Sequence, residues 1–408
     1  MPVGFKATYN GRETEIDDLL IKREFFGDGG LFACGYNVSG AVGDGTTTNR
    51  SSFVSTAAGA GLNWKQVSGG SAVAAIKSDG TLWTWGYNGS GHLGTGNQTN
   101  RSSPGTTAGG GVDWKQVSMG SDQYYGIGQA AAVKTDGTLW TWGNNTRGQL
   151  GTGNTTSRSS PGTTVGGGTN WKQVSVGVHG AVSSNMAAVK TDGTLWTWGS
   201  NNSRSLGAGT SDAATSRSSP GTVAGGGTNW SQVSCGRQYM GAVKTDGTLW
   251  MWGLGGAGRL GNDQYADRSS PGTTSGGGTN WKQVSCGYSS TAAIKFDGTL
   301  WTWGSRSNGQ LGDGYTTTSK LSPEGIAGGG TNWKQVSSRT NFMAAVKTDG
   351  TLWTWGRNTN GNLGVGNSTS TASPVTPVGF AGTSFKSVAE GVSDINRLTL
   401  FAITDLTI

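Results

Sequence analysis

Short runs of apolar residues alternate with polar positions along this chain, and glycine-rich or asparagine-rich turns separate the runs. The stretch AAVKTDGTLWTWG, residues 131–143, contains two such runs around Asp-Gly. This dipeptide is a strong hairpin signal, because both central residues of a type I′ turn need positive φ. In the second run Trp140 and Trp142 fall on one face of the expected strand, and Leu139 and Thr141 fall on the other. The pattern predicts β-hairpins, and no window shows the 3.6-residue period of a helix.

Two further strands are expected around each hairpin. The run WKQVS, residues 171–175, alternates in the same way. The run RSSPG, residues 158–162, contains a proline, which cannot donate to a central ladder, so it is expected at a sheet edge. One unit therefore holds about four strands.

The hairpin is part of a repeat. GTLWTWG at residues 80–86 returns five more times nearly unchanged, and a divergent copy reads GLFACG. The spacing between copies is 51 to 57 residues, measured between Gly35, Gly86, Gly143, Gly199, Gly253, Gly304 and Gly356. A second marker, NWKQVS, also counts seven units when the weaker SFKSV at residues 384–388 is included. Repeats of this length indicate one body of stacked units rather than several domains.

Seven four-stranded units predict an all-β fold, a seven-bladed β-propeller. The composition agrees with this, because 75 of the 408 residues are glycine and only 13% are charged. A blade cannot bury both of its faces by itself, so we expect the 18 tryptophans to pack between neighbouring blades. A stacking platform and a light-sensing cluster are the alternatives.

The two ends of the chain supply complementary pieces of one unit. Residues 31–35 form the second half of a hairpin without its first half, and residues 384–388 and 398–405 form strands without a following LWTWG. We expect residues 31–35 to join the C-terminal strands in one composite blade, which removes the exposed edges of an open array. The predicted propeller spans residues 28–408, and residues 1–27 form a separate arm.

The loop after the Trp-Gly strand carries a family resemblance. It recurs as GHLGTG (91–96), GQLGTG (148–153), GQLGDG (309–314) and GNLGVG (361–366). These motifs resemble the regulator of chromosome condensation repeat over residues 28–408, and the resemblance implies a propeller. The family includes guanine-nucleotide exchange factors, ultraviolet photoreceptors, β-lactamase inhibitor proteins and uncharacterised microbial binders. The chain has no counterpart of the exchange loop and lacks the photoreceptors' Gly-Trp-Arg-His-Thr motif, so neither activity is expected.

Residues that could support catalysis are sparse. The two histidines, His92 and His179, lie in different units without a clustered acid or nucleophile, so we interpret them as polar loop residues. Cys235 and Cys286 occupy equivalent positions, which indicates packing, and no CxxC pair suggests a metal. The glycine loops precede no helix, so they are expected to form turns rather than a phosphate cradle. We expect no enzyme activity, no cofactor and no metal site.

The formal net charge is +7, which raises the question of nucleic-acid binding. The basic residues follow the repeat, however, because a lysine precedes each Asp-Gly turn and an arginine begins most RSSPG runs. They are therefore spread around the ring rather than gathered in one stripe. This distribution predicts solvated blade edges and no nucleic-acid partner. Weak attraction to acidic glycans or to an acidic partner is the alternative.

Two neighbouring units carry longer connections between their first and second strands. Most units have 9 or 10 residues from the serine of QVS to the lysine of AAVK, whereas Ser118 to Lys134 spans 16 and Ser175 to Lys190 spans 15. Equivalent loops of a repeat array share a face, which is often the binding face. The candidate contact residues, with ordinary loop decoration as the alternative, are Asp122, Gln123, Tyr124, Tyr125, His179 and Asn185.

The first 27 residues differ in composition from the repeats. They combine acidic and apolar side chains but lack both the apolar core of a signal peptide and the length of a membrane span. They are predicted to form an arm that docks into another subunit, with a strand or turn lying on the propeller itself as the alternative. The candidate docking residues are Glu13, Glu15, Asp17, Asp18, Leu19, Leu20 and Ile21.

A repeat platform with an arm and without a catalytic set resembles phage virion components built around such repeats. The resemblance implies a tail-fibre, tail-tip or capsid-surface protein whose arm contacts other virion proteins in a multi-subunit assembly. Its loops would contact a host-surface glycan or protein, and no membrane insertion is expected. The expected location is the virion, after production in the host cytoplasm. The alternative is a free protein-binding module, such as an inhibitor or scaffold.

Overall fold

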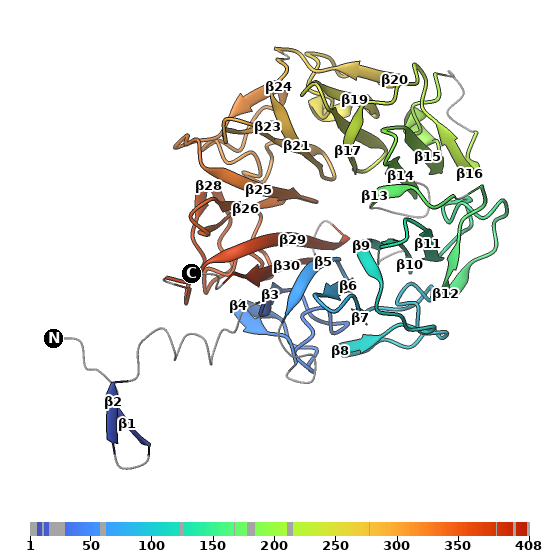
Figure 1. Cartoon of the computed structure of the whole chain (residues 1–408). Coiled ribbons are helices and arrows are strands. Elements are labelled where there is room, and N and C mark those ends of the chain that lie inside the picture. Colours follow the sequence, from blue (N-terminus) through green and yellow to red (C-terminus); the bar gives the residue numbers. More distant parts are fainter. Residues whose placement is uncertain are drawn as a thin grey trace.

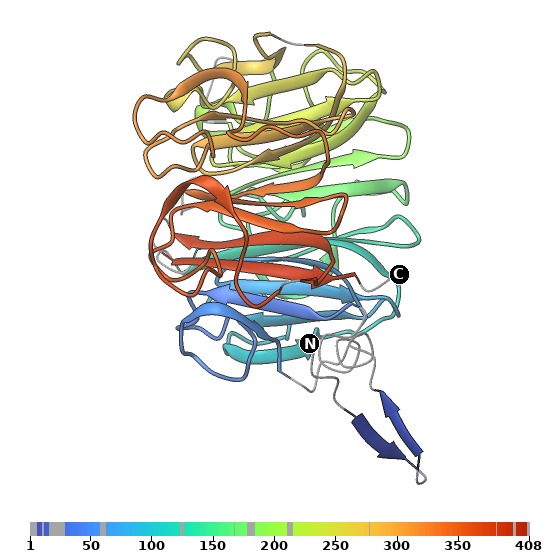
Figure 2. The same ribbon diagram turned by 90° about the vertical axis from the view of Figure 1, so that its left-hand side faces the viewer.

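A computed structural model describes residues 6–9, 12–15, 29–57, 63–122, 126–166, 168–177, 184–209, 215–276, 278–380, 382–394 and 397–405. Apart from one two-stranded sheet, the strands of these residues form seven four-stranded antiparallel sheets around a central axis (Figure 1). The strands run across the thickness of a disc, as the side view shows (Figure 2). The predicted all-β, seven-bladed propeller with four-stranded blades is therefore confirmed.

The strands of each blade are counted from the axis outward. The first strands are β5 (Trp64–Gly69), β9 (Trp114–Asp122), β13 (Trp171–Val176), β17 (Trp230–Cys235), β21 (Trp281–Cys286), β25 (Trp333–Ser338) and β29 (Phe385–Asp394). The second strands are β6 (Ala72–Lys77), β10 (Ile127–Lys134), β14 (Asn185–Lys190), β18 (Tyr239–Lys244), β22 (Ser290–Lys295), β26 (Phe342–Lys347) and β30 (Arg397–Thr404).

The third strands carry the LWTWG motif or its variants. They are β3 (Leu31–Gly35), β7 (Leu82–Gly86), β11 (Leu139–Gly143), β15 (Leu195–Gly199), β19 (Leu249–Gly253), β23 (Leu300–Gly304) and β27 (Leu352–Gly356). The fourth strands are β4 (Arg50–Ser55), β8 (Arg101–Thr106), β12 (Arg158–Thr163), β16 (Arg217–Thr222), β20 (Arg268–Thr273), β24 (Lys320–Gly325) and β28 (Thr371–Val375). The proline-containing RSSPG runs thus lie at sheet edges, as predicted.

Two 3₁₀ turns and two short strands complete the described chain. The 3₁₀ turns η2 (Asn202–Arg204) and η3 (Gly256–Gly258) lie in the loops that follow β15 and β19. A separate two-stranded sheet joins β1 (Lys6–Tyr9) to β2 (Arg12–Glu15).

One blade is assembled from strands at both ends of the ring. Strand β3 pairs with β30, so that Leu31 lies opposite Ile403 and Gly35 opposite Thr399. Strands β29 and β4 complete the same sheet. This arrangement confirms the predicted composite blade. Because the pairing closes the ring, no gap is left between the first and the last repeat.

Tryptophans fill the spaces between blades. Trp142 of β11 packs with Ala72 of the preceding blade, whereas Leu139 of the same strand packs with Trp171 of the next blade. The indole of Trp142 also donates to the backbone carbonyl of His92 in the preceding blade at 2.8 Å. Five other described tryptophans repeat this bond. The predicted inter-blade packing is confirmed, and each buried ring removes roughly 150–250 Å² from water.

The repeat lysines lie over tryptophan rings. The Nζ atom of Lys134 is 4.8 Å from the ring centroid of Trp114 and 4.7 Å from that of Trp140. Such cation–π contacts contribute about 0.5–1 kcal/mol at partly exposed sites. These lysines lie at blade edges, where they are half-buried and also contact tryptophan rings. The same arrangement is found at Lys77, Lys190, Lys244, Lys295 and Lys347.

Glutamines of the QVS motif join the first strands of neighbouring blades. Nε2 of Gln283 donates to the carbonyl of Val336 at 2.9 Å, and its Oε1 accepts from the N–H of the same valine at 3.2 Å. The side-chain amide of the glutamine thus bonds to the valine backbone as the backbone of a neighbouring strand does in a β-sheet. At the seventh junction Ser387 takes the glutamine position, and its hydroxyl has no partner among the described residues. The other pairs are Gln66–Val117, Gln116–Val174, Gln173–Val233, Gln232–Val284 and Gln335–Val388.

Candidate binding face

Two sets of connections emerge at the same end of the disc. Because consecutive strands of a blade are antiparallel, the connection from first to second strand and the loop from third to fourth strand share one end. We name this end the loop face. The opposite end carries the Asp-Gly turns and the glycine-rich returns to the next blade.

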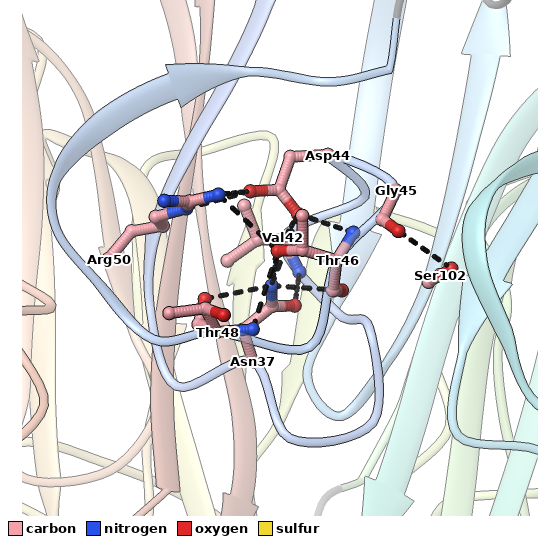
Figure 3. Close-up of polar contacts among 8 residues, drawn as sticks. All are labelled: Asn37, Val42, Asp44, Gly45, Thr46, Thr48, Arg50 and Ser102. Carbon is pink, nitrogen blue, oxygen red and sulfur yellow. Dashed lines mark hydrogen bonds and ion pairs between the residues drawn. The ribbon is translucent and has the colours of Figure 1, made fainter.

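An asparagine organises most loops between third and fourth strands. Oδ1 of Asn37 accepts from the N–H of Val42 at 2.8 Å, and its Nδ2 donates to the carbonyl of Thr48 at 3.0 Å (Figure 3). Arg50 forms an ion pair with Asp44 at 2.6 Å in the same loop (Figure 3). The equivalent asparagines, each of which accepts from the N–H five residues later, are Asn88, Asn145, Asn201 and Asn358.

Two neighbouring blades lack this asparagine. Gly255 replaces it in the β19–β20 loop, and Arg306 replaces it in the β23–β24 loop. Arg306 is neutralised within its own loop, because it lies 2.7 Å from a carboxylate oxygen of Asp313. The β19–β20 loop also carries a charged residue, Arg259, at a position that is neutral in the other loops. The equivalent residues are Ala41, His92, Gln149, Ser205, Gln310 and Asn362.

Four side chains gather where these two blades meet on the loop face, namely Arg237, Tyr239, Arg259 and Tyr288, and we name them the Arg–Tyr cluster. The guanidinium carbon of Arg237 lies 4.2 Å from the ring centroid of Tyr288, and its Nη1 donates to the hydroxyl of that tyrosine. In Arg259, Nε donates to the carbonyl of Gly256 at 2.6 Å and Nη1 donates to the carbonyl of Tyr288 at 2.8 Å. The ring of the fully buried Tyr239 lies 5.6 Å from the Arg259 guanidinium.

The Arg–Tyr cluster carries positive charge without an adjacent carboxylate. Arg259 is only 7% exposed. Burial is the largest cause that lowers the pKa of its guanidinium, and the charge of Arg237 acts in the same direction. No described carboxylate lies within 4.0 Å of either arginine, and Asp267 attracts Arg259 only from farther away. Buried charges are normally paired, so this arrangement is suited to an anionic group from outside the chain.

The backbone around the cluster is constrained. Gln238 and Ala257 are not glycines, yet both adopt left-handed conformations with φ of 62°. Such residues cost about 1–3 kcal/mol each and concentrate at functional sites. Gly236 has no room for a side chain, because a Cβ there would lie 2.4 Å from the ring of Tyr239 and 2.7 Å from the carbonyl of Gly287. These constraints hold the two arginines in place.

The axis of the ring contains a polar cavity of about 260 Å³, lined by first-strand residues. Its serines contribute to the contacts between blades, as when Oγ of Ser68 accepts from the N–H of Met119 at 3.0 Å. Arg339 reaches across the axis, and its Nη1 donates to the carbonyl of Met119 at 3.2 Å. The described lining residues do not combine an acid, a base and a nucleophile.

Most of the predicted contact residues lie outside the described part of the chain. Asp122 is the last residue of β9, on the loop face. Gln123, Tyr124, Tyr125 and His179 lie outside the described residues. Their role in binding stays a prediction.

Asn185 is a correction to the predicted contact set. It begins β14, lies opposite Gly199 in the sheet and is fully buried. Its side chain therefore does not reach the surface, because the second strand begins earlier than the length of the loop suggested. The flanks of the two long connections are nevertheless adjacent, since Nε2 of Gln129 donates to the carbonyl of Gly177 at 3.2 Å.

The predicted arm is only partly described. Glu13 and Glu15 lie in β2, opposite Thr8 and Lys6 of β1. Within the described chain this sheet pairs with no strand of the propeller. The docking role of the arm stays a prediction. The other candidate docking residues, which lie outside the described residues, are Asp17, Asp18, Leu19, Leu20 and Ile21.

His92 lies in the β7–β8 loop, as the sequence indicated, but its side chain belongs to the core. It is fully buried, with its ring 5.6 Å from that of Tyr87. Burial lowers its pKa to about 4. The cysteines are buried and not in disulfides, and burial raises the pKa of Cys235 to about 12. Cys235 and Cys286 are thus packing residues, as predicted.

The described residues contain neither a metal-ligand cluster nor a membrane-spanning helix. No three histidine, cysteine, aspartate or glutamate side chains there gather as a metal site requires. The same residues contain no helix with the length and apolar character needed to cross a bilayer.

The Arg–Tyr cluster was missed by the sequence analysis. Its signal was the set of departures from the repeat: Gly255 in place of the loop asparagine, and Arg259 at a neutral position. The predicted contact residues were instead placed in the two longer connections, because an insertion is easier to recognise in a sequence than a substitution within a loop of normal length. The spatial meeting of Arg237, Arg259 and Tyr288 also depends on contact between neighbouring blades.

Comparison with known families agrees with the architecture. The model of the Regulator of chromosome condensation (RCC1) repeat matches residues 79–124, 136–183, 192–243, 246–294, 297–346 and 349–393. A second model of this repeat matches residues 114–149 and 281–310.

Individual proteins are also similar. Ultraviolet-B receptor UVR8 of Arabidopsis thaliana is 31% identical over 310 residues, which cover 75% of this chain and 68% of the receptor. E3 ubiquitin-protein ligase HERC2 of Homo sapiens is 29% identical over 293 residues, which cover 71% of this chain but only 6% of that protein.

Solved structures share the fold. Yeast RCC1 (Prp20), in its complex with Kap60, superimposes with a TM-score of 0.77 at 15% identity, covering 96% of this chain and 93% of that one. Human WBSCR16 superimposes with a TM-score of 0.76 at 20% identity, covering 93% of this chain and 100% of that one.

Proposed function

Because the chain belongs to the regulator of chromosome condensation (RCC1) repeat family, we propose that it is a non-enzymatic platform that binds a protein partner through its loop face. Proteins of the same fold support this proposal. Yeast RCC1 (Prp20) is bound by Kap60, and Prp20p of Saccharomyces cerevisiae is described by its binding properties to Gsp1p and histones.

One observation carries the proposal. The blades share nearly the same scaffold of tryptophan packing, lysine–tryptophan contacts and glutamine bonds, whereas the largest differences in the length of their connections lie on the loop face. They include the two long connections, and the Arg–Tyr cluster lies on the same face. Loops on a rigid scaffold are the usual carriers of recognition. The described cavity on the axis offers no catalytic set that would favour an enzyme.

A pair of matched variants tests which end of the disc binds. Tyr265 and Tyr315 are 59% and 64% exposed on loops of the loop face, and Val112 and Phe296 are both 68% exposed at the opposite end. Affinity capture followed by crosslinking should lose the partner when both tyrosines become serine. It should retain the partner when Val112 and Phe296 become serine. The reverse result, or equal capture by both variants, would contradict the proposal.

The more specific proposal is that this platform is a virion component, such as a tail-fibre, tail-tip or capsid-surface protein, attached through residues 1–27. The resemblance to phage repeat proteins and the acidic, apolar composition of the arm support it. Deleting residues 1–27 should abolish incorporation into particles while leaving the propeller folded. Normal incorporation of the deletion variant would count against the proposal and in favour of a free protein-binding module.

A further inference from the structure

The geometry of the Arg–Tyr cluster points to a carboxylate site, and we propose that Arg237 and Arg259 receive an acidic side chain of the protein partner. This inference rests on the proposed function, because it names the chemistry with which the loop face recognises its partner. The site lies at the junction of two blades, β17–β20 and β21–β24.

Arg50 and Arg306 on other loops are neutralised by carboxylates of the chain, whereas no described carboxylate lies within 4.0 Å of Arg237 or Arg259. Arg50 pairs with Asp44 at 2.6 Å, and Arg306 pairs with an acidic residue of its own loop. Arg259, by contrast, is more than nine-tenths buried and has only backbone carbonyls as its described hydrogen-bond acceptors. A guanidinium in this environment gains more from an incoming anion than an exposed one does, because water screens it less.

Several guanidinium donors of the cluster have no described acceptor within the chain. Arg259 uses Nε and Nη1 for the described carbonyls, so its Nη2 donates to no described residue. Arg237 uses only Nη1, for the hydroxyl of Tyr288, and its Nε and Nη2 donate to no described residue. The Arg237 guanidinium also lies over the ring of Tyr288, and this contact restricts its position. Fixed guanidinium forks match the geometry of carboxylates.

The distribution of charge favours an acidic protein segment over a nucleic acid. A phosphate backbone is bound by a stripe of lysines and arginines. Here the repeat lysines lie over tryptophan rings. The arginines that begin several fourth strands donate to carbonyls five residues later, at Thr106, Thr163, Thr222 and Thr273. The repeat lysines and these arginines are thus engaged around the ring, and the Arg–Tyr cluster is a compact site for one or two anionic groups.

The surroundings of the cluster also suit a protein. Tyr265 and Tyr315 are exposed on the third-to-fourth-strand loops of the same two blades. Exposed tyrosines and arginines are enriched at protein interfaces, where tyrosine supplies apolar area and a hydroxyl. An acidic side chain in the cluster and apolar contacts with the two tyrosines form one coherent binding surface.

A labelled hexaglutamate peptide tests the site directly by fluorescence anisotropy with the full chain. We expect it to bind, a hexaglutamine peptide not to bind, and Arg237→Gln to weaken binding by about tenfold or more. The matched control is Arg147→Gln, which removes the same charge from an exposed position on the loop face and should leave binding nearly unchanged. Tyr288→Phe keeps the charge but removes the hydroxyl that holds Arg237, so it should weaken binding by a smaller factor. Circular dichroism establishes that each variant is folded.

Each result bears on the proposal. Equal weakening by Arg237→Gln and Arg147→Gln would overturn it, because binding would then reflect net charge alone. Tighter binding of a single-stranded DNA hexamer through the same arginine would also overturn it. If the native partner is captured equally by wild type and Arg237→Gln, the proposed carboxylate site is wrong, but the proposal that the loop face binds a protein is unaffected. If Tyr265→Ser with Tyr315→Ser has no effect on capture, the platform itself fails.

Discussion

Replacing the buried His92 by glutamine should remove most of the pH dependence of stability between about pH 7 and about pH 5. Burial holds the pKa of His92 at about 4, against an ordinary value of 6.5. The folded protein therefore resists protonation of this ring more than the unfolded chain does. The associated stability is complete above the unfolded pKa, declines as the pH falls below 6.5 and is lost by the time the folded pKa is reached.

The size of the effect follows from the two pKa values. A fall from 6.5 to about 4 corresponds to about 3 kcal/mol when the titration is complete. At about pH 5 the unfolded histidine is almost fully protonated and the folded one is not, which gives a loss of about 2 kcal/mol relative to neutral pH. This loss is large against a typical total stability of about 5–15 kcal/mol.

Glutamine is the matched replacement, because Gln149 and Gln310 occupy the equivalent position in other blades. Oε1 of Gln149 accepts from the N–H of Arg147 at 2.8 Å, and its backbone carbonyl accepts from the indole of Trp198 at 2.9 Å. The His92→Gln variant should therefore fold and keep the backbone carbonyl that bonds to the next blade.

Urea unfolding followed by tryptophan fluorescence at about pH 7 and about pH 5 measures the difference. Wild type should lose about 2 kcal/mol more than His92→Gln on acidification. His179→Gln serves as the control, because it removes the other histidine of the chain. Equal losses in wild type and His92→Gln would refute the reasoning that a neutral, buried ring sets the pH dependence.

Three further predictions concern the scaffold. Gln283→Ala removes both hydrogen bonds to Val336 and should lower the free energy of unfolding by about 1–3 kcal/mol in urea titrations, whereas an unchanged value would show that the pair contributes nothing. Ser387→Gln should supply the missing pair at the seventh junction and raise the free energy of unfolding by about 1 kcal/mol, and a decrease would contradict this. The pKa values of six turn aspartates are lowered by the hydroxyl and N–H of the threonine two positions later, so their contribution is intact above about pH 4 and lost on acidification. Replacing all six by asparagine should flatten the decline of the thermal midpoint below about pH 4, and an unchanged decline would argue against this role. They are Asp79, Asp136, Asp192, Asp246, Asp297 and Asp349.

The fold was predictable because the same physical pattern occurs in every unit. The Asp-Gly turns, the alternation in LWTWG and the proline in RSSPG each define one strand or turn, and repetition then defines the ring. The incomplete units at residues 31–35 and 384–405 were enough to predict the composite blade. Each of these inferences depends only on local sequence patterns, which can be recognised in one sequence without knowledge of the contacts between blades.

The candidate site was not predictable in the same way. His92 looked like a polar loop residue, because nothing in GHLGTG shows that the histidine points into the core. Asn185 looked like part of a loop, because the length of an insertion does not reveal where the next strand begins. Arg237 and Tyr288 come from neighbouring blades and meet only in the assembled ring. These features depend on contacts between units, and local periodicity carries no information on them.

Because β3 is synthesised early and its partner β30 is synthesised last, the composite blade can form only when translation is nearly complete. Thr404 donates to the carbonyl of Gly30, which is 374 residues away. At roughly 5–20 residues per second, a ribosome needs roughly 20–75 s to synthesise the chain between β3 and the end of β30. During that interval β3 waits without its partner, and nearly identical strands of chains growing on adjacent ribosomes are available to it. Domain swapping of β3 between two chains therefore competes with closure of the ring within one chain. Chaperone binding or slow translation near the end of the message would change the ratio of closed monomers to swapped chains.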